Sequence, residues 1–458
     1  MKKFLPDLIA ILAFIILSFA YFFPADIEGR ILFQHDTAAG VGAGQESKEY
    51  LERTGERTRW TNSIFGGMPT YQMSPSYDST TSLKGVEKVY RLFLPDYVVL
   101  TFIMMLGFYI LLRAFGISAW LAGLGGVIWA FSSYFFILIP AGHIWKFVTL
   151  AYIPPTIAGV VLAYRKKYLL GGIVTALFIA LQIQSNHIQM SYYFMFVILF
   201  FVGAYFEDAY KKKELPHFFK ASGVLALAAV VGVCINISNL YHTYEYSKET
   251  MRGKSELKQE GAAASQTSSG LDRDYITNWS YGIGETLTLL VPNVKGGGSG
   301  STMSQSEAAM AKANPMYNGI YSQLPQYFGE QPWTAGPVYV GAFVMFLFVL
   351  GCFIVKGPLK WALLGATIFS ILLSWGKNFM GLTDFFIDYV PMYNKFRAVS
   401  SILVIAEFTI PLLAIFALKE ILSKPDMLKQ EKNCRGVIAA LVLTAGVALI
   451  LAVAPGTF

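Results

Sequence analysis

Long apolar runs alternate with short polar connections along the whole chain, and this alternation restricts it to a helical membrane architecture. A helix needs about twenty predominantly apolar residues to cross a bilayer. Hydrophobic residues make up 55% of the 458 residues and charged residues only 14%, whereas a soluble domain carries about 25% charged residues. The sequence therefore predicts an all-α polytopic membrane protein with about eleven transmembrane helices, at 5–23, 97–115, 118–139, 147–164, 168–185, 189–206, 219–238, 336–355, 358–375, 399–419 and 436–454.

Basic residues fall in every second connection between these windows, which predicts the orientation of the chain. Cytoplasmic loops of membrane proteins carry an excess of lysine and arginine. With a cytoplasmic N-terminus, all the basic clusters lie inside: Lys2-Lys3, Arg113, 165–167, 211–213, Lys356 with Lys360, and 419–435. Topology thus explains the net charge of +7, and we expect no nucleic-acid partner.

The first window has a competing interpretation as a signal peptide. It starts with two lysines, and Ser18-Phe19-Ala20 resembles a cleavage site. The bulky residues at 21–24 that follow favour an uncleaved helix. Cleavage would leave the rest of the topology unchanged.

The predicted topology puts both long polar segments on the extracytoplasmic side. The short cytoplasmic connections leave no room for a nucleotide-binding domain, and the chain has no GxxxxGK[ST] or dinucleotide-binding motif. The predicted organisation is a first transmembrane helix at 1–23, a first extracytoplasmic loop at 24–96, transmembrane helices 2–7 at 97–238, a second extracytoplasmic loop at 239–335, and transmembrane helices 8–11 at 336–458. The first loop contains a predicted juxtamembrane helix near 45–59.

Asp36 is the first candidate for a catalytic group. It follows His35 shortly after the first window, and Leu32 and Phe33 tie its segment to apolar surroundings. A carboxylate at a partly desolvated interface can serve as a general base. The alternative is that Asp36 caps a helix beginning at Thr37, since aspartate is a favoured N-cap residue.

Further polar residues lie near the predicted outer ends of the helices. His143 and Lys146 occupy a very short external turn, while Asn186, His187 and Gln189 interrupt an apolar run. Polar residues at membrane depth normally face a cavity or one another. The alternative for the second group is a tight turn between two helices.

Two acidic features in the second loop also qualify as candidates. Glu285 precedes an apolar stretch and is either a site acid or a helix cap. Asp272-Arg273-Asp274 forms a D-x-D triplet, which is common by chance in polar loops. Neither the five histidines nor the three cysteines have the spacing of a metal site, and we expect no cofactor.

Three basic residues lie on the predicted external side, although basic residues are otherwise concentrated in the cytoplasmic connections: Lys377, Lys395 and Arg397. Basic residues close to the membrane surface bind lipid phosphate. The alternative is that they pair with the nearby Asp384 and Asp388.

The chain resembles the YfhO-type bacterial membrane proteins, which belong to the GT-C class of polyprenyl-phosphate-sugar-dependent glycosyltransferases. The resemblance covers nearly the whole chain. The residues that carry it are the N-terminal span with His35-Asp36, then Trp60, Gly66-Gly67-Met68-Pro69, Asn186-His187-Ile188-Gln189, Tyr327-Phe328-Gly329-Glu330-Gln331-Pro332, Gly336-Pro337-Val338-Tyr339-Val340-Gly341 and Lys395-Phe396-Arg397-Ala398-Val399-Ser400.

The resemblance implies a GT-C-like fold in the bacterial cytoplasmic (inner) membrane and an inverting sugar transfer. Asp36 would deprotonate the hydroxyl of an envelope glycan, lipid or protein acceptor, with His35 as its neighbour. Lipid-linked donor phosphate would contact Lys146, Lys377, Lys395 and Arg397, while His143, Asn186, His187, Gln189 and Glu285 would line the cavity. Metal-dependent members often carry a D-x-D or E-x-D at the loop acid; Asp36 has no such partner, which favours a metal-independent reaction.

Two other functions remain open: a transporter or flippase of lipid-linked glycans, and a non-catalytic component of envelope assembly. A proton-coupled carrier usually needs several charged residues within its spans. The predicted spans contain few, of which Glu407 is the clearest. This favours an enzyme.

Overall fold

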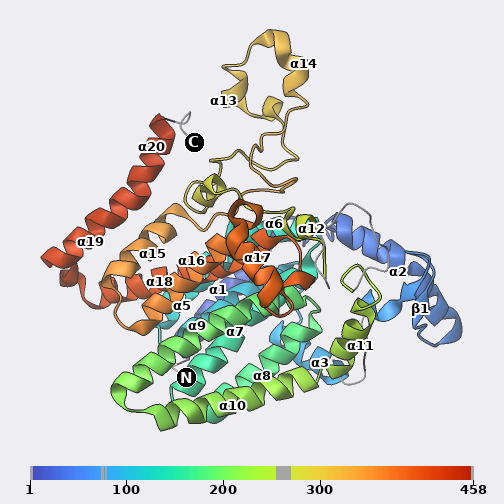
Figure 1. Cartoon of the computed structure of the whole chain (residues 1–458), viewed down its shortest axis with the longest axis horizontal. Helices are drawn as coiled ribbons and strands as arrows, with labels where there is room; N and C mark the ends of the chain where they lie inside the picture. Colours follow the sequence, from blue (N-terminus) through green and yellow to red (C-terminus); the bar gives the residue numbers. More distant parts are fainter. Residues whose placement is uncertain (1–3, 74–76, 78–79, 254–269, 455–458) are drawn as a thin grey trace. The chain divides into compact units, whose positions relative to one another are not determined.

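The computed structural model describes residues 4–73, 77, 80–253 and 270–454, and helices dominate it (Figure 1). Among these residues the only sheet is a two-residue antiparallel pairing of β1 (Trp60–Thr61) with β2 (Met68–Pro69). The predicted all-helical class is confirmed.

Six helices of the described chain are long and apolar enough to cross a membrane. Two helix pairs, bent by 49° and 110°, raise this number to eight, and three further apolar helices have 10–17 residues. A 17-residue helix is about 25 Å long, slightly shorter than the roughly 30 Å hydrocarbon core. The structure thus supports a multi-pass membrane protein, and the predicted total of eleven requires the short helices to cross too. The six are Leu5–Phe22, Ile144–Tyr164, Ile188–Lys212, Leu215–Cys234, Val399–Ser423 and Glu431–Val453.

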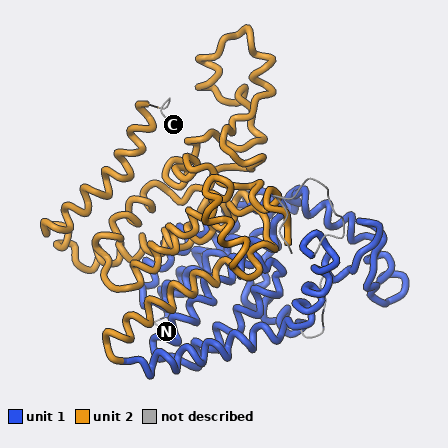
Figure 2. The backbone as a smooth tube through the Cα atoms, viewed as in Figure 1, with its two compact units in different colours: residues 1–130, 138–192, 214–254 blue, residues 131–137, 193–213, 255–458 orange. Residues whose placement is uncertain are grey.

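The chain divides into two compact units (Figure 2). Unit 1 comprises residues 1–130, 138–192 and 214–254. Its elements, besides β1 and β2, are α1 (Leu5–Phe22), α2 (His35–Thr54), η1 (Thr70–Gln72), α3 (Thr81–Tyr90), α4 (Val98–Ala114), α5 (Ala119–Ala130), the end of α6 (Ser133–Ala141), α7 (Ile144–Tyr164), α8 (Tyr168–Gln184), the start of α9 (Ile188–Lys212), α10 (Leu215–Cys234) and α11 (Ile237–Ser247).

Helix α7 forms the centre of unit 1 and packs against α4, α8 and α10. Small residues permit this close packing. A Cβ added at Gly107 of α4 would lie 2.5 Å from the carbonyl oxygen of Ala151, and one at Gly171 of α8 would lie 2.7 Å from that of Gly159. Small residues at helix interfaces are typical of membrane proteins, because they let backbones approach.

The two ends of unit 1 differ in chemistry. At one end the basic connections meet acidic partners: Arg113 Nε lies 2.8 Å from Asp7 Oδ1, and Lys166 Nζ lies 2.9 Å from Glu214 Oε1. The N-terminus of α7 and the C-terminus of α8, with His143 and Asn186, lie at the other end. Two of the predicted basic connections, at Arg113 and Lys166, are thus paired with acids in unit 1.

Unit 2 comprises residues 131–137, 193–213 and 255–458. Its core surrounds α18, which packs against α15 and α16. Its elements are the start of α6, the rest of α9, α12 (Arg273–Thr277), η3 (Gly284–Leu289), η4 (Met303–Gln305), α13 (Glu307–Met310), η5 (Pro315–Tyr317), α14 (Asn318–Tyr321), α15 (Ala342–Ile354), α16 (Pro358–Ser374), η6 (Gly376–Phe379), α17 (Met380–Tyr389), η7 (Tyr393–Lys395), η8 (Val399–Leu403), α18 (Val404–Ser423), η9 (Pro425–Lys429), α19 (Glu431–Leu441), the π-helical η10 (Val442–Gly446) and α20 (Val447–Val453).

Candidate functional site

The helix that carries Asp36 is longer than predicted. Helix α2 begins at His35, not near residue 45, and ends at Thr54, where Gly55 adopts a left-handed conformation with φ 74°. The early turns are rich in glycine and alanine, and glycine lowers helix propensity, which explains why the sequence pattern missed them. The N-cap is Gln34. Asp36 therefore lies in the first turn, where the helix dipole favours a negative charge, and the predicted cap role is wrong.

The first turn of α2 rests on the turn between α6 and α7. Gln34 Nε2 donates a 2.6 Å hydrogen bond to the carbonyl oxygen of Ile139. Gly142 has φ 81°, and a Cβ added there would lie 3.2 Å from the Asp36 Cβ and 3.0 Å from the Thr37 nitrogen. This close approach requires glycine and brings the two segments together.

Asp36 and His143 form the closest acid–imidazole pair of this site. His143 Nε2 lies 3.0 Å from Asp36 Oδ2, whereas His35 Nδ1 lies 3.6 Å from Asp36 Oδ1. Sequence reasoning assigned the neighbouring role to His35 and placed His143 only among the cavity residues. The Asp36 side chain is 55% exposed, so the expected partial desolvation is absent. An accessible carboxylate held by an imidazole can accept a proton from a bound hydroxyl.

Lys146 and His187 lie beside this pair within unit 1. Lys146, in the first turn of α7, is 9% exposed. Burial, with the nearby Lys146 charge as the next cause, lowers the pKa of His187 to about 3. His187 is therefore neutral at physiological pH, and its buried Nδ1 has no hydrogen-bond partner among the described residues.

The segment between α8 and α9 is the tight turn that the sequence offered as an alternative. Asn186 has φ 60°, and its Oδ1 accepts a 3.1 Å hydrogen bond from Asn239 Nδ2. Gln189 lies in the first turn of α9. The polar residues here meet one another, as expected for polar groups at membrane depth.

Glu285 lies in the first turn of η3 in unit 2, and its carboxylate is buried. Its side chain is 2% exposed and accepts hydrogen bonds from Gly282 N at 2.7 Å, Glu330 N at 3.1 Å and Tyr327 Oη at 2.5 Å. Burial of the Tyr327 hydroxyl raises its pKa, and the hydrogen bond to Glu285 is the next largest cause. A Cβ at Gly329 would lie 2.3 Å from Glu285 Oε1. The Glu285 carboxylate is thus in close contact with the segment 327–330.

The D-x-D triplet also has a structural role. Asp272 Oδ1 caps α12 by accepting hydrogen bonds from Asp274 N at 2.9 Å and Tyr275 N at 3.2 Å. Arg273 pairs with Asp384, and its Nη2 lies 2.6 Å from Asp388 Oδ1. The two aspartates are therefore partners of Arg273.

The predicted phosphate-binding cations of unit 2 contact different groups of the protein. Arg397 Nη1 donates a 2.7 Å hydrogen bond to Tyr275 Oη, and the guanidinium carbon lies 5.3 Å from the centroid of that ring. Burial lowers the pKa of Lys395. Lys377 Nζ approaches the Glu330 carbonyl oxygen at 3.5 Å. The sequence offered Asp384 and Asp388 as alternative partners for these cations, and the structure pairs both aspartates with Arg273.

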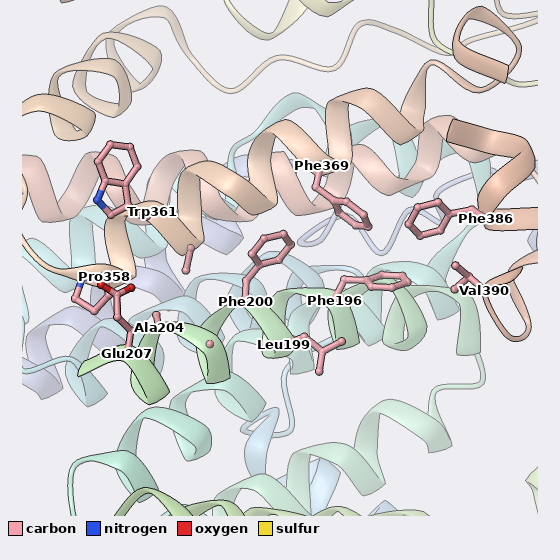
Figure 3. Close-up of a pocket in the computed structure, with 12 residues that line it drawn as sticks. Phe196, Leu199, Phe200, Ala204, Glu207, Pro358, Trp361, Phe369, Phe386 and Val390 are labelled. Atoms are coloured by element: carbon pink, nitrogen blue, oxygen red, sulfur yellow. The ribbon is translucent and has the colours of Figure 1, made fainter. Parts of the chain in front are cut away.

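An apolar groove of about 540 Å³ also lies in unit 2. Figure 3 shows rings of α9 and α16 facing one another across it, with Glu207 at one end and Phe386 and Val390 at the other. The Phe386 ring lies 5.3 Å from that of Tyr393, two residues before Lys395. The groove therefore ends near the basic segment. Its ring-bearing residues are Phe196, Phe200, Trp361, Phe369 and Phe386.

No family model, curated protein or solved structure matches the chain. Within the described ranges, no group of three or more His, Cys, Asp or Glu side chains could hold a metal ion.

Proposed function

We propose that the protein is an integral membrane glycosyltransferase of the GT-C type. It transfers a sugar from a polyprenyl-phosphate donor to an envelope glycan, lipid or protein acceptor on the extracytoplasmic side. The observation that carries this proposal is the Asp36–His143 pair, with 3.0 Å between Oδ2 and Nε2. Asp36 lies in the first turn of α2, the helix that follows α1, and His143 is the N-cap residue of α7.

The proposed reaction needs one base and one anion-binding group. The acceptor hydroxyl gives its proton to the Asp36 carboxylate as its oxygen attacks the anomeric carbon. The bond from that carbon to the phosphate oxygen breaks, and the lipid phosphate leaves with the bonding electrons. The attack occurs from the opposite face, so the anomeric configuration inverts. His143 holds the carboxylate in place, and donors such as Lys146 stabilise the departing charge.

The groove and cations of unit 2 support a lipid-linked donor. An isoprenoid chain is apolar along its whole length and ends in an anionic phosphate. The groove supplies aromatic walls, and its Phe386 end contacts Tyr393 in the segment that carries Lys395 and Arg397. This combination of apolar and cationic surfaces matches both parts of a polyprenyl phosphate.

Arg397→Ala is expected to weaken polyprenyl-phosphate binding about tenfold, because a charge-assisted hydrogen bond contributes about 1.5–3 kcal/mol. The measurement is titration of the lipid into purified protein in nanodiscs. Arg435→Ala is the matched control, since Arg435 is exposed and pairs with Glu431. Equal affinity of Arg397→Ala and the wild type would restrict Arg397 to contacts within the protein, such as those with Tyr275 and Trp279.

The alternatives are a transporter or flippase of lipid-linked glycans and a non-catalytic component of envelope assembly. One observation favours transport: Glu407 of α18 is fully buried and accepts a hydrogen bond from Ser132, while its Oε1 has no partner among the described residues. Buried acids in membrane helices occur in proton relays. Translocation of labelled lipid across vesicles, without sugar transfer, would support this alternative.

The proposed orientation puts Gly298 outside and Lys212 inside. Cysteine substitutions at these positions should react with a membrane-impermeant maleimide on opposite sides of the membrane, because of the bias of basic residues toward the cytoplasm. The native cysteines Cys234, Cys352 and Cys434 are first replaced by alanine. Labelling of both positions from the same side would overturn the topology.

A further inference from the structure

We propose that a second pocket, in unit 1, binds a saccharide, which in the proposed reaction is the acceptor. The pocket lies among α3, the N-terminus of α7, the C-terminus of α8 and the α10–α11 junction, with a volume of about 350 Å³. This volume is within the range of about 300–1,000 Å³ that is typical of small-molecule sites. The sequence singled out the polar run at 182–189, which contains Gln184 and Ser185, but it did not indicate a pocket.

One wall of the pocket carries a preorganised charged network. Glu87 Oε1 accepts a 2.8 Å hydrogen bond from Tyr152 Oη and another from Arg91 Nη2, and Arg91 Nε donates to Tyr152 Oη at 3.2 Å. These bonds use only one carboxylate oxygen of Glu87 among the described residues. Lys84 lies one helical turn before Glu87 and also lines the pocket. This wall therefore offers both hydrogen-bond donors and an acceptor.

Two amide side chains on the other wall carry unused acceptors. Asn236 is 1% exposed, and its Nδ2 donates a 2.9 Å hydrogen bond to the Ala180 carbonyl oxygen, which fixes the orientation of the amide. Its Oδ1 and the buried Oε1 of Gln184 have no partner among the described residues. An unpaired buried acceptor costs about 1–3 kcal/mol. A ligand that donates hydrogen bonds to Oδ1 and Oε1 would remove this cost.

The requirement for donors identifies the ligand class. Sulfate has no proton to donate, and inorganic phosphate near neutral pH has only one or two on a charged ion, so neither satisfies Asn236 and Gln184 as well as a neutral polyol does. Sugar hydroxyls both donate and accept hydrogen bonds, and they match pocket walls that carry both donors and acceptors. Trp145 adds a half-exposed indole on which the C–H face of a sugar ring can pack.

The position of Trp145 connects the pocket to the proposed chemistry. Trp145 lies between His143, the partner of Asp36, and Lys146 in the chain, and Ile144 lines the same pocket. A saccharide held here lies close to the segment that orients the proposed base. The assignment as acceptor rests on the proposed function, whereas saccharide binding itself is independent of it.

Saturation-transfer NMR on the purified full-length protein in nanodiscs tests the inference. The probes are the methyl glycosides of glucose, galactose, mannose, rhamnose and N-acetylglucosamine, with inorganic phosphate as competitor. We expect at least one glycoside to bind and phosphate not to displace it. Gln184→Ala and Trp145→Ala should each weaken that binding about tenfold, as expected for the loss of about 1.4 kcal/mol. Arg435→Ala, an exposed substitution at a residue that does not line the pocket, should bind it as the wild type does.

Three outcomes would overturn saccharide binding, and two others would contradict only its link to the proposed reaction. Absence of glycoside binding, displacement by phosphate, or wild-type affinity in both pocket variants would exclude a saccharide site here, provided that thermal unfolding shows the variants to be folded. Retained glycoside binding in a wild-type protein that transfers no sugar would contradict only the proposed enzyme. Transfer with an unchanged acceptor KM in both variants would contradict only the acceptor assignment.

Discussion

Replacing Asp36 with asparagine is expected to reduce the rate of sugar transfer by about 10²–10⁴-fold, the usual contribution of a general base. Asparagine has nearly the same size and can still accept a hydrogen bond from His143 Nε2, which lies 3.0 Å from the native carboxylate. It cannot take the proton of the acceptor. The measurement is kcat for donor turnover, together with donor affinity, which should not change.

The two histidines provide a matched pair of controls for Asp36. Because His143 lies closer to the carboxylate than His35 does, His143→Ala should slow transfer more than His35→Ala. Wild-type turnover by Asp36→Asn would show that this residue is only a first-turn acid of α2. Equal effects of the two histidine variants would remove the orienting role of His143.

Replacing Glu285 with alanine is expected to destabilise unit 2 by about 3 kcal/mol. The substitution leaves the Gly282 and Glu330 amides and the Tyr327 hydroxyl without their buried acceptor, and a hydrogen bond to a charged group contributes about 1.5–3 kcal/mol. The check is chemical denaturation of the purified protein in detergent, followed by the fluorescence of its tryptophans.

Glu330→Ala is the control for this prediction. It removes a neighbouring exposed carboxylate but keeps the backbone amide that donates to Glu285. Exposed substitutions usually change stability by less than about 0.5 kcal/mol. Equal stability of Glu285→Ala and Glu330→Ala would refute the structural role of Glu285.

The apolar helices were predictable because hydrophobic length alone identifies them. All eleven predicted windows contain an apolar helix or a bent pair of helices. The breaks within pairs were not predictable: α16 runs apolar to Ser374, and the chain then bends by 110° into α17. Such a bend depends on local packing, for example of Gly376 at φ 46° beside Ser280, and not on hydropathy.

The candidate site was predictable in its residue types but not in its pairings. Asp36 and His143 stood out as polar residues near predicted helix ends, yet they are far apart in sequence and meet only because Gly142 admits the first turn of α2. Asp384 and Asp388 looked like partners of Arg397 because they are close in sequence. Arg273, from another segment, takes them instead.

The pocket proposed to bind a saccharide was not predictable as a pocket, because its walls come from separate segments. Glu87 of α3 and Arg91, the residue that caps the C-terminus of this helix, stand four residues apart, a spacing that normally indicates an exposed helical pair. In the structure Tyr152 of α7 joins them and turns the pair into a wall of the pocket. Gln184 and Asn236 look like ordinary helix-end residues until their unpaired oxygens are located.

The most direct test of the proposed transferase is a transfer assay with purified protein and a panel of radiolabelled polyprenyl-phosphate sugars. Membrane extract supplies the acceptors, and release of free polyprenyl phosphate is followed over time. We predict that the wild type consumes at least one donor and that Asp36→Asn leaves this donor intact. Equal consumption by Asp36→Asn, or no consumption of any donor by a folded wild type that binds it, would contradict the account.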